Sequence, residues 1–483
     1  MCRGPDSVSG TLIIQQLFLR ADGRVKAMPH FRKAFRCFTE GRKGSRVNLF
    51  EVFPRLKAFF ANRLNLLYAR TAGDLFFTFL ILLGLFGPQD PTRNISLFIS
   101  WGIWWTSVVL SWFFLGKLWC GVCPFPGLGR LFQRYGLSLN LDIPQYLRNF
   151  FVHLSVILLG LIIWVESVTN MKEWPAGTAY LLLSILFGAT LMAVLFKGQA
   201  WCRHVCPLGK IIGSAATIAV TEFRPDRSKC RTCKTFACKR GSDKTPGCPI
   251  YLGAVNVKSN FYCLVCGHCV TLCKKDSPAI YLRSPFSEIT SHVALTSKKT
   301  TYLTYSYIIP FLMGSQLARF TQHQYWYELV EGFFFGSNLI AFTALLVFGS
   351  LFVLTVIRLG AAFFIPIKND VFGLFSPMVP ILVPLAFTGE LAYRLHFLLT
   401  NAGNFLPILG RQFGINMEAL AFIVPEGVIH SVCLAVLAAG FFAGSYVLHI
   451  FHQGKIVGSL SKIKNIAVYV LIFLIFLAYI MLF

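Results

Sequence analysis

The sequence predicts a polytopic α-helical membrane protein of about nine transmembrane helices, with a cysteine-rich domain inserted between the fourth and the fifth. Hydrophobic residues make up 55% of the 483 residues, whereas charged residues make up only 13%. Several stretches have about the 20 apolar residues that a membrane-spanning helix needs. Eight cysteines are concentrated between Cys230 and Cys273, in a segment without a predicted span. These three observations separate the chain into membrane helices and one polar insert.

Nine apolar stretches are predicted to cross the membrane, and the fifth is the weakest because it contains Tyr and Ser. They lie at about 72–87, 95–116, 147–167, 177–196, 301–318, 333–357, 371–399, 420–450 and 465–483. They divide the chain into four parts: a basic amphipathic N-terminal segment (1–70), a four-helix membrane core with a duplicated motif (71–222), the cysteine-rich domain (223–290) and a C-terminal membrane domain of about five helices (300–483).

The distribution of Lys and Arg predicts the orientation. Nine spans place the termini on opposite sides, and 39 of the 45 basic residues fall in segments on the side of the N-terminus, while Arg148 and Arg394 fall inside predicted spans. Only Arg93, Lys172, Arg319 and Arg411 fall in segments on the other side. Because positive charge marks the cytoplasmic side, we expect the N-terminus and the insert inside and Phe483 outside. The net charge of +25 follows from this topology and does not indicate nucleic acid.

The N-terminal segment contains two basic aromatic stretches. In 31–38 and in 49–60, aromatic residues alternate with Arg and Lys at roughly helical spacing. Such a pattern predicts a helix on the anionic lipid of the inner leaflet. A segment docked on a partner subunit is the alternative.

The cysteines of the insert have the spacing of iron–sulfur ligands. Three closely spaced cysteines and a distant fourth occur twice, with Pro249 after Cys248. In two-cluster ferredoxins the fourth cysteine of each run ligates the other cluster. The pattern therefore predicts a ferredoxin-like domain with two [4Fe–4S] clusters, and two zinc sites are the alternative. The first set is Cys230, Cys233, Cys238 and Cys273, and the second set is Cys263, Cys266, Cys269 and Cys248.

A Cys-Pro motif occurs twice in the membrane core. Trp119-Cys120-Gly-Val-Cys123-Pro124 follows the second span, and Trp201-Cys202-Arg-His-Val-Cys206-Pro207 follows the fourth. Four thiols related by a repeat predict one tetrahedral metal site or a redox-active dithiol pair. Alternatively they are small apolar residues at helix ends, where proline ends the helix. Cys120, Cys123, Cys202 and Cys206 are called the Cys-Pro cysteines below.

The two motifs followed by two ferredoxin-type cysteine sets resemble the NapH/NosR-type membrane polyferredoxins, over roughly residues 65–285. The second motif has that family's Cys-x3-Cys-Pro spacing, whereas Cys120 and Cys123 are separated by two residues. The resemblance implies a bacterial inner-membrane electron-transfer protein with a NapH-like core and five added spans. It also implies a link to the quinone pool and to other redox subunits, such as a cytochrome c or a molybdenum or copper enzyme.

Ionisable residues inside predicted spans indicate function, because each is costly in lipid. Glu390 and His430 are expected at similar depth, and together with His396 and Glu426 they predict a quinone-binding cleft. The alternative is helix packing through Glu390–Arg394 or Glu426–His430 pairs. A haem b on two histidines is a further option, although no repeated histidine spacing supports it. Candidate haem ligands are His153, His396, His430, His449 and His452, and the lone Cys2, Cys37 and Cys433 are interpreted as structural.

These features predict an electron-transfer subunit rather than a stand-alone enzyme, and no catalytic residue is assigned. The sequence contains no Gly-rich nucleotide loop and no nucleophile elbow. Two alternatives stay open at this point: a maturation factor that delivers electrons to a metalloenzyme or metal during assembly, and a redox sensor.

Overall fold

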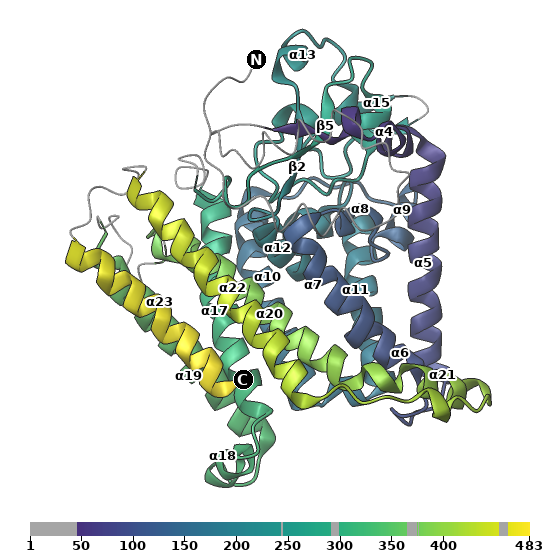
Figure 1. Cartoon of the computed structure of the whole chain (residues 1–483). Coiled ribbons are helices and arrows are strands. Elements are labelled where there is room, and N and C mark those ends of the chain that lie inside the picture. Colours follow the sequence, from purple (N-terminus) through teal and green to yellow (C-terminus); the bar gives the residue numbers. More distant parts are fainter. Residues whose placement is uncertain (1–45, 243–244, 291–298, 365–373, 375, 454–461) are drawn as a thin grey trace, which may run out of the picture.

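The computed structural model describes residues 46–242, 245–290, 299–364, 374, 376–453 and 462–483. This part of the chain is mostly helical, with small β-sheets gathered at one end of a helical bundle (Figure 1). Eight of its helical stretches are long and apolar enough to cross a membrane, by length and composition. They are α5 (Arg63–Phe86), α6 (Ile95–Leu97) with η1 (Phe98–Trp104) and α7 (Trp105–Phe114), α10 (Gln145–Val168), α11 (Pro175–Leu195), α19 (Asn338–Ala361), α20 (Met378–Asn401) with η5 (Ala402–Asn404) and α21 (Phe405–Phe413), α22 (Glu426–Gln453), and α23 (Lys462–Leu482).

The fifth predicted span forms a helix without the expected apolar composition. It is α17 (Lys299–Gln322), which is not among the eight membrane-length apolar helices of the described residues. Several of its polar side chains are fully buried, and Gln316 donates a 2.8 Å hydrogen bond to the Ala386 carbonyl of α20. Since this helix packs against protein, its polar groups find partners there. The prediction of about nine apolar spans thus exceeds by one the number that the described residues supply.

Helix α20 connects the two membrane halves. It contacts η1 and α7 of the first half and α17 and α22 of the second. Its residues Met378–Arg394 are all buried by other parts of the protein. Short elements lie at both ends of the bundle: α8 (Trp119–Val122), α9 (Gly127–Arg134), η3 (Trp201–Val205) and α12 (Pro207–Ala215) near the β-sheets, and η2 (Met171–Glu173), α18 (Tyr327–Phe333) and η6 (Glu418–Leu420) elsewhere.

The insert is built on a three-stranded antiparallel sheet in the order β1-β5-β2. Strand β2 (Thr221–Pro225) precedes the cysteines, β5 (Pro278–Leu282) follows them, and β1 (Val47–Asn48) pairs with the other edge of β5. The cysteine-bearing segment is therefore a long excursion between two adjacent strands. It contains α13 (Arg227–Arg231), α14 (Ala237–Arg240), β3 (Gly241–Ser242), β4 (Thr245–Pro246), η4 (Ala254–Asn256) and α15 (His268–Leu272).

Residues 49–60 differ from the expectation. They form α3 (Leu49–Val52) and α4 (Pro54–Ala61), and Phe50 and Phe60 are buried in one core with Phe223 and Val270 of the insert. One face of this stretch therefore packs on the insert of its own chain, while Phe53 and Phe59 are exposed. Periodicity could not reveal this, because an amphipathic helix shows only that it has an apolar face. The stretch 31–38 lies outside the described residues.

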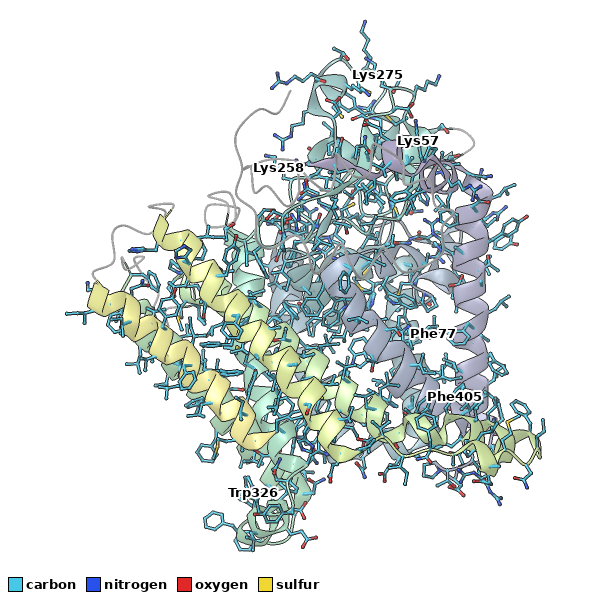
Figure 2. All side chains as sticks on the ribbon, viewed as in Figure 1. Lys57, Phe77, Lys258, Lys275, Trp326 and Phe405 are labelled. Carbon is cyan, nitrogen blue, oxygen red and sulfur yellow. The ribbon has the colours of Figure 1, made fainter. Side chains whose placement is uncertain are left out.

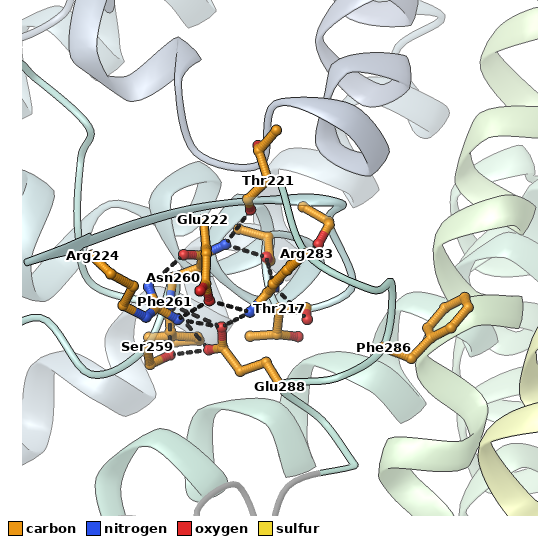
Figure 3. Close-up of polar contacts among 12 residues, drawn as sticks. Thr217, Thr221, Glu222, Arg224, Ser259, Asn260, Phe261, Arg283, Phe286 and Glu288 are labelled. Carbon is orange, nitrogen blue, oxygen red and sulfur yellow. Dashed lines mark hydrogen bonds and ion pairs between the residues drawn. The ribbon is translucent and has the colours of Figure 1, made fainter. Parts of the chain in front are cut away.

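A polar network fastens the insert to the membrane core (Figure 3). Arg283, just after β5, donates to the carbonyls of Thr217 and Ala219, which follow α12. The same guanidinium pairs with Glu288 at 2.5 Å, and Arg224 of β2 pairs with Glu288 at 2.9 Å. Since these groups are buried and mutually satisfied, the network holds both ends of the insert in one orientation.

Candidate iron–sulfur sites

The second set of cysteines lines one cavity. Cys248, Cys263, Cys266 and Cys269 surround it together with apolar side chains such as Ile250 and Leu252. Every pair of these four thiols is close enough to interact electrostatically. The structure therefore brings together the four residues that the spacing rule assigns to one cluster.

The loop that carries three of these cysteines has an unusual backbone. Val265 has a φ of +50° and Gly267 a φ of +81°, so the chain twice adopts the left-handed conformation within a few residues. A Cβ atom on Gly267 would lie 2.6 Å from the Leu66 side chain. Left-handed backbone at a non-glycine residue such as Val265 is costly and concentrates at functional sites. The conformation winds the Cys263–Cys269 loop around the cavity.

The first set is less closely gathered. The Cys230 thiol lies 3.1 Å from Ser277 Oγ, and the Ser277 N–H donates to Cys273 Sγ at 3.4 Å. Cys233 interacts electrostatically with Cys238. Cys238 also contacts Cys269 of the second set, and this hydrogen bond lowers the pKa of Cys238 to about 6. The structure thus shows two pairs beside the second set rather than four thiols around one described cavity.

The four Cys-Pro cysteines line a second cavity, called the Cys-Pro cavity below. All pairs of these thiols interact electrostatically. Burial raises the pKa of Cys120 to about 11. The lining is otherwise apolar and aromatic and includes Trp104, Trp105, Trp119 and Trp201.

Wide helical turns and prolines explain how the motifs present their thiols. In η3 the Cys206 N–H donates to the Trp201 carbonyl five residues earlier, which is the hydrogen bond of a π-helix. Single π-helical turns are frequent at functional sites. Pro207 then begins α12, and Cys206 Sγ accepts a hydrogen bond from the Gly209 N–H at 3.2 Å. The thiol therefore stands at a new helix start, where burial raises the pKa of Cys206 and the Gly209 N–H partly opposes that shift.

The two cavities are neighbours. Leu264 lines both, and Cys120 and Cys202 pack against the cluster of Cys248, Ile250 and Leu264. Gly121 permits the approach, because a Cβ atom there would lie 2.9 Å from the Val265 carbonyl oxygen.

Arg70 of α5 also bridges the two sites. Its guanidinium donates to the Cys266 carbonyl at 2.5 Å and to the Gly121 carbonyl at 3.0 Å. In the sequence, Arg70 is only one of many basic residues before the first predicted span. No motif identifies it, because its partners are backbone carbonyls from distant segments.

The second set supplies the donors of an iron–sulfur cluster. Within the described residues, no three His, Cys, Asp or Glu side chains are placed to hold one metal ion. The four thiols of the second set line one cavity, and thiolates are the ligands of iron–sulfur clusters. Such clusters supply one-electron transfer. The second set therefore fits the group that the cysteine spacing predicts, whereas the first set is not gathered around a cavity among the described residues.

The polar residues of the membrane domain form a buried chain of ion pairs. Glu390 of α20 pairs with Arg319 of α17 at 2.6 Å and with Arg394 at 2.9 Å. Arg394 continues to Glu166 of α10 at 2.9 Å. The structure thus places Glu390 in the alternative arrangement, the Glu390–Arg394 pair. Arg319, predicted in an outer segment, is instead fully buried within α17, and sequence reasoning missed Glu166.

The histidines gather separately from this ion-pair chain. The His396 ring lies 6.2 Å from the rings of both His323 and His430, and Phe483 contacts His396 and His430. His430 Nδ1 lies 3.0 Å from the backbone carbonyl of Glu426, whose side chain is exposed. The structure therefore brings His396 and His430 together but not Glu390 with them.

The remaining histidines and lone cysteines add little to this site. His153 lies against Tyr307, and His449 and His452 belong to α22. Cys433 is buried, with its Sγ 3.5 Å from the Ala392 carbonyl. Cys2 and Cys37 lie outside the described residues.

Comparison with known proteins agrees with these sites. The family model described as a 4Fe-4S binding domain matches residues 97–141 and 178–213. Each segment contains one Cys-Pro motif. The ferredoxin-type protein NapH of Escherichia coli is 29% identical over 178 residues, which is 33% of this chain and 60% of NapH. The resemblance to the NapH/NosR-type polyferredoxins is confirmed.

Two uncharacterised proteins of Methanocaldococcus jannaschii are also similar to this chain. MJ0749 is 25% identical over 177 residues, which is 35% of this chain and 65% of that protein. MJ0750 is 25% identical over 192 residues, which is 35% of this chain and 74% of that protein. The chain thus spans less than two thirds of the length of NapH and MJ0749, and no solved structure matches it.

Proposed function

We propose that this protein is a membrane-bound electron-transfer subunit of a redox complex. It passes electrons between the quinone pool or a membrane partner and [4Fe–4S] clusters in the cytoplasmic insert. The observation that carries the proposal is the shared wall of two cysteine-lined cavities, in which Leu264 belongs to both. A thiol site at the end of the membrane bundle and a thiol site in the insert are thereby adjacent.

The surroundings of the insert support electron transfer rather than hydrolytic chemistry. The second set holds its thiols in an apolar enclosure, where low solvent exposure helps to set a reduction potential. The polar network of Figure 3 fixes this enclosure to the core through Arg283 and Glu288. A fixed separation between redox sites keeps the rate of electron transfer constant.

The experiment replaces Cys263 and Cys266 together by Ser and measures iron, acid-labile sulfide and electron transfer in anaerobically purified protein. We expect a loss of about four iron atoms per chain, since these residues ligate one [4Fe–4S] cluster, and a loss of electron transfer to the membrane partner. Cys433→Ser is the matched control, because Cys433 is buried outside both cavities. Unchanged iron in the double variant, or zinc in place of iron, would contradict the proposal.

The proposed route also requires the insert to face the cytoplasm in a bacterial inner membrane. The support is the excess of Lys and Arg on one side of the predicted spans. Reporter fusions after residue 285 should behave as cytoplasmic and fusions after Phe483 as external. A periplasmic signal after residue 285 would reverse the route.

A further inference from the structure

Two buried lysines lie close to the Cys-Pro cysteines in the backbone: the Cys120 N–H donates to the Lys117 carbonyl, and the Lys210 N–H donates to the Cys206 carbonyl. Lys117 is 4% exposed and Lys210 is 7% exposed. Lys117 Nζ donates to the Phe261 carbonyl at 2.8 Å, and Lys210 Nζ donates to the Arg203 carbonyl at 3.4 Å. Among the described residues neither forms an ion pair. Their positive charges act on the thiols: Lys117 interacts electrostatically with Cys120, and both lysines interact electrostatically with Cys206.

A nearby anion stabilises buried ammonium groups of this kind. An ammonium group taken out of water is strongly destabilising unless a negative charge pairs with it. Four protonated thiols, or two disulfides, carry no charge and leave both lysines uncompensated. Four thiolates around a metal ion or a [4Fe–4S] core form a dianion. The electrostatics therefore favour a metal-based occupant over a dithiol pair.

The donor set fits a cluster. All four thiols line one cavity, and four cysteine thiolates are the ligand set of a [4Fe–4S] cluster. The matching family model, described as a 4Fe-4S binding domain, covers both motifs.

Hydrogen-bond donors in the cavity wall also favour a cluster. The indole N–H groups of Trp104 and Trp105 are buried and make no hydrogen bond within the described part of the chain, and both side chains line the cavity. The Trp201 side chain already interacts with the Cys206 thiol. Buried donors without acceptors are uncommon in proteins. The sulfurs of a cluster are acceptors, and hydrogen bonds to them are among the determinants of its potential.

We infer that the Cys-Pro cavity holds a third [4Fe–4S] cluster, ligated by Cys120, Cys123, Cys202 and Cys206. Lys117 and Lys210 are its counter-charges and raise its reduction potential. This inference rests on the proposed electron-transfer function and places a redox site at the end of the membrane bundle. The cluster is a one-electron carrier, so no bond or proton transfer accompanies its reduction.

The first test is the iron content of the Cys202→Ser, Cys206→Ser double variant, purified anaerobically. We expect about twelve iron atoms in the wild type, from three four-iron clusters, and a loss of one third in the variant. The Cys433→Ser control should retain all iron. Unchanged iron in the double variant, or one zinc lost in place of four irons, would overturn the inference.

The second test is a redox titration followed by electron paramagnetic resonance. Replacing Lys117 by Gln removes a nearby positive charge, so the midpoint potential of one cluster should shift to a more negative value at unchanged iron content. Lys210→Gln should act in the same direction, and Lys258→Gln at an exposed position (Figure 2) should shift nothing. Unshifted potentials in both buried-lysine variants would contradict the counter-charge role.

The two proposals fail separately. If the Cys202, Cys206 variant keeps all its iron while the Cys263, Cys266 variant loses about four atoms, the third cluster is wrong and the electron-transfer function stands. If the Cys263, Cys266 variant retains its iron, the proposed function itself is wrong.

Discussion

Two buried charged regions of this protein differ in how their charges are balanced. In the ion-pair chain, Arg319 and Arg394 meet the carboxylates of Glu390 and Glu166 at 2.6 to 2.9 Å. Near the Cys-Pro cysteines, Lys117 and Lys210 donate to backbone carbonyls, and neither forms an ion pair among the described residues. A balanced set of charges can be complete as structure, whereas an unbalanced set requires something else to bind. The difference separates a packing element from a ligand site.

The two regions touch at one tryptophan. The Arg394 guanidinium lies 5.5 Å from the Trp105 ring centre, and Trp105 lines the Cys-Pro cavity. The ion-pair chain therefore joins α10, α20 and α17 and also packs against Trp105. It helps to hold this tryptophan in place in the cavity wall.

The largest expected effect comes from breaking the ion-pair chain. Arg394→Met retains bulk but leaves the buried carboxylates of Glu166 and Glu390 without their shared partner. Removing one member of a buried pair costs about 3–5 kcal/mol, so the variant should unfold at a markedly lower temperature in detergent. Arg394→Lys should recover part of the loss, and Glu328→Gln at an exposed position is the control. Unchanged stability of Arg394→Met would remove the distinction between the two regions.

The sequence predicts the cysteine sites better than the buried charges. Cys263, Cys266, Cys269 and Cys248 can be grouped from their spacing alone, because the ligand spacing of a cluster is local and specific. The Cys-Pro motifs can be paired because they repeat. No motif identifies Lys117 or Lys210. In the sequence each is an ordinary basic residue near a predicted helix end, and only the folded structure shows that it is buried.

The membrane helices show the same limit of prediction from sequence. Eight apolar stretches can be located in the sequence because lipid exposure requires apolar composition over a fixed length. Helix α17 lacks that composition because it contains Ser315, Gln316 and Arg319. These polar side chains are fully buried within the protein. Charge counting consequently places Arg319 in an outer segment, which is wrong. Which charges meet across helices is a tertiary property that one sequence does not contain.

Weakening the network of Figure 3 should have the next largest effect. Glu288→Gln removes the carboxylate that Arg224 and Arg283 share. Because Glu222 also contacts both arginines, we expect a loss of about 1–3 kcal/mol and faster proteolysis of the insert. Glu51→Gln is the exposed control. Resistance equal to the wild type would show that the insert is held to the core by other contacts.

A smaller change tests the shared wall of the two cavities. Gly121→Ala places a Cβ atom 2.9 Å from the Val265 carbonyl oxygen, so the motif and the insert must move apart. Overpacking costs about 1–3 kcal/mol, and electron transfer between the sites should slow while the iron content stays constant. Gly427→Ala is the matched control, since nothing lies within 4 Å of its Cβ position. Wild-type electron transfer in Gly121→Ala would mean that the close approach is not the route.

The smallest expected effect on stability is at His430. We propose that His396 and His430 belong to a quinone-binding cleft, on the ground that their rings lie 6.2 Å apart at the end of α22 opposite its last turn. Glu390, engaged by two arginines, is assigned to packing. His430→Leu keeps apolar bulk and breaks no ion pair of the described residues, so stability should change by no more than about 0.5 kcal/mol. Cluster reduction by a quinol should fall, whereas reduction by dithionite should not. If quinol reduction is unchanged in His430→Leu and in His396→Leu, the two histidines are packing residues and electrons enter through a partner subunit.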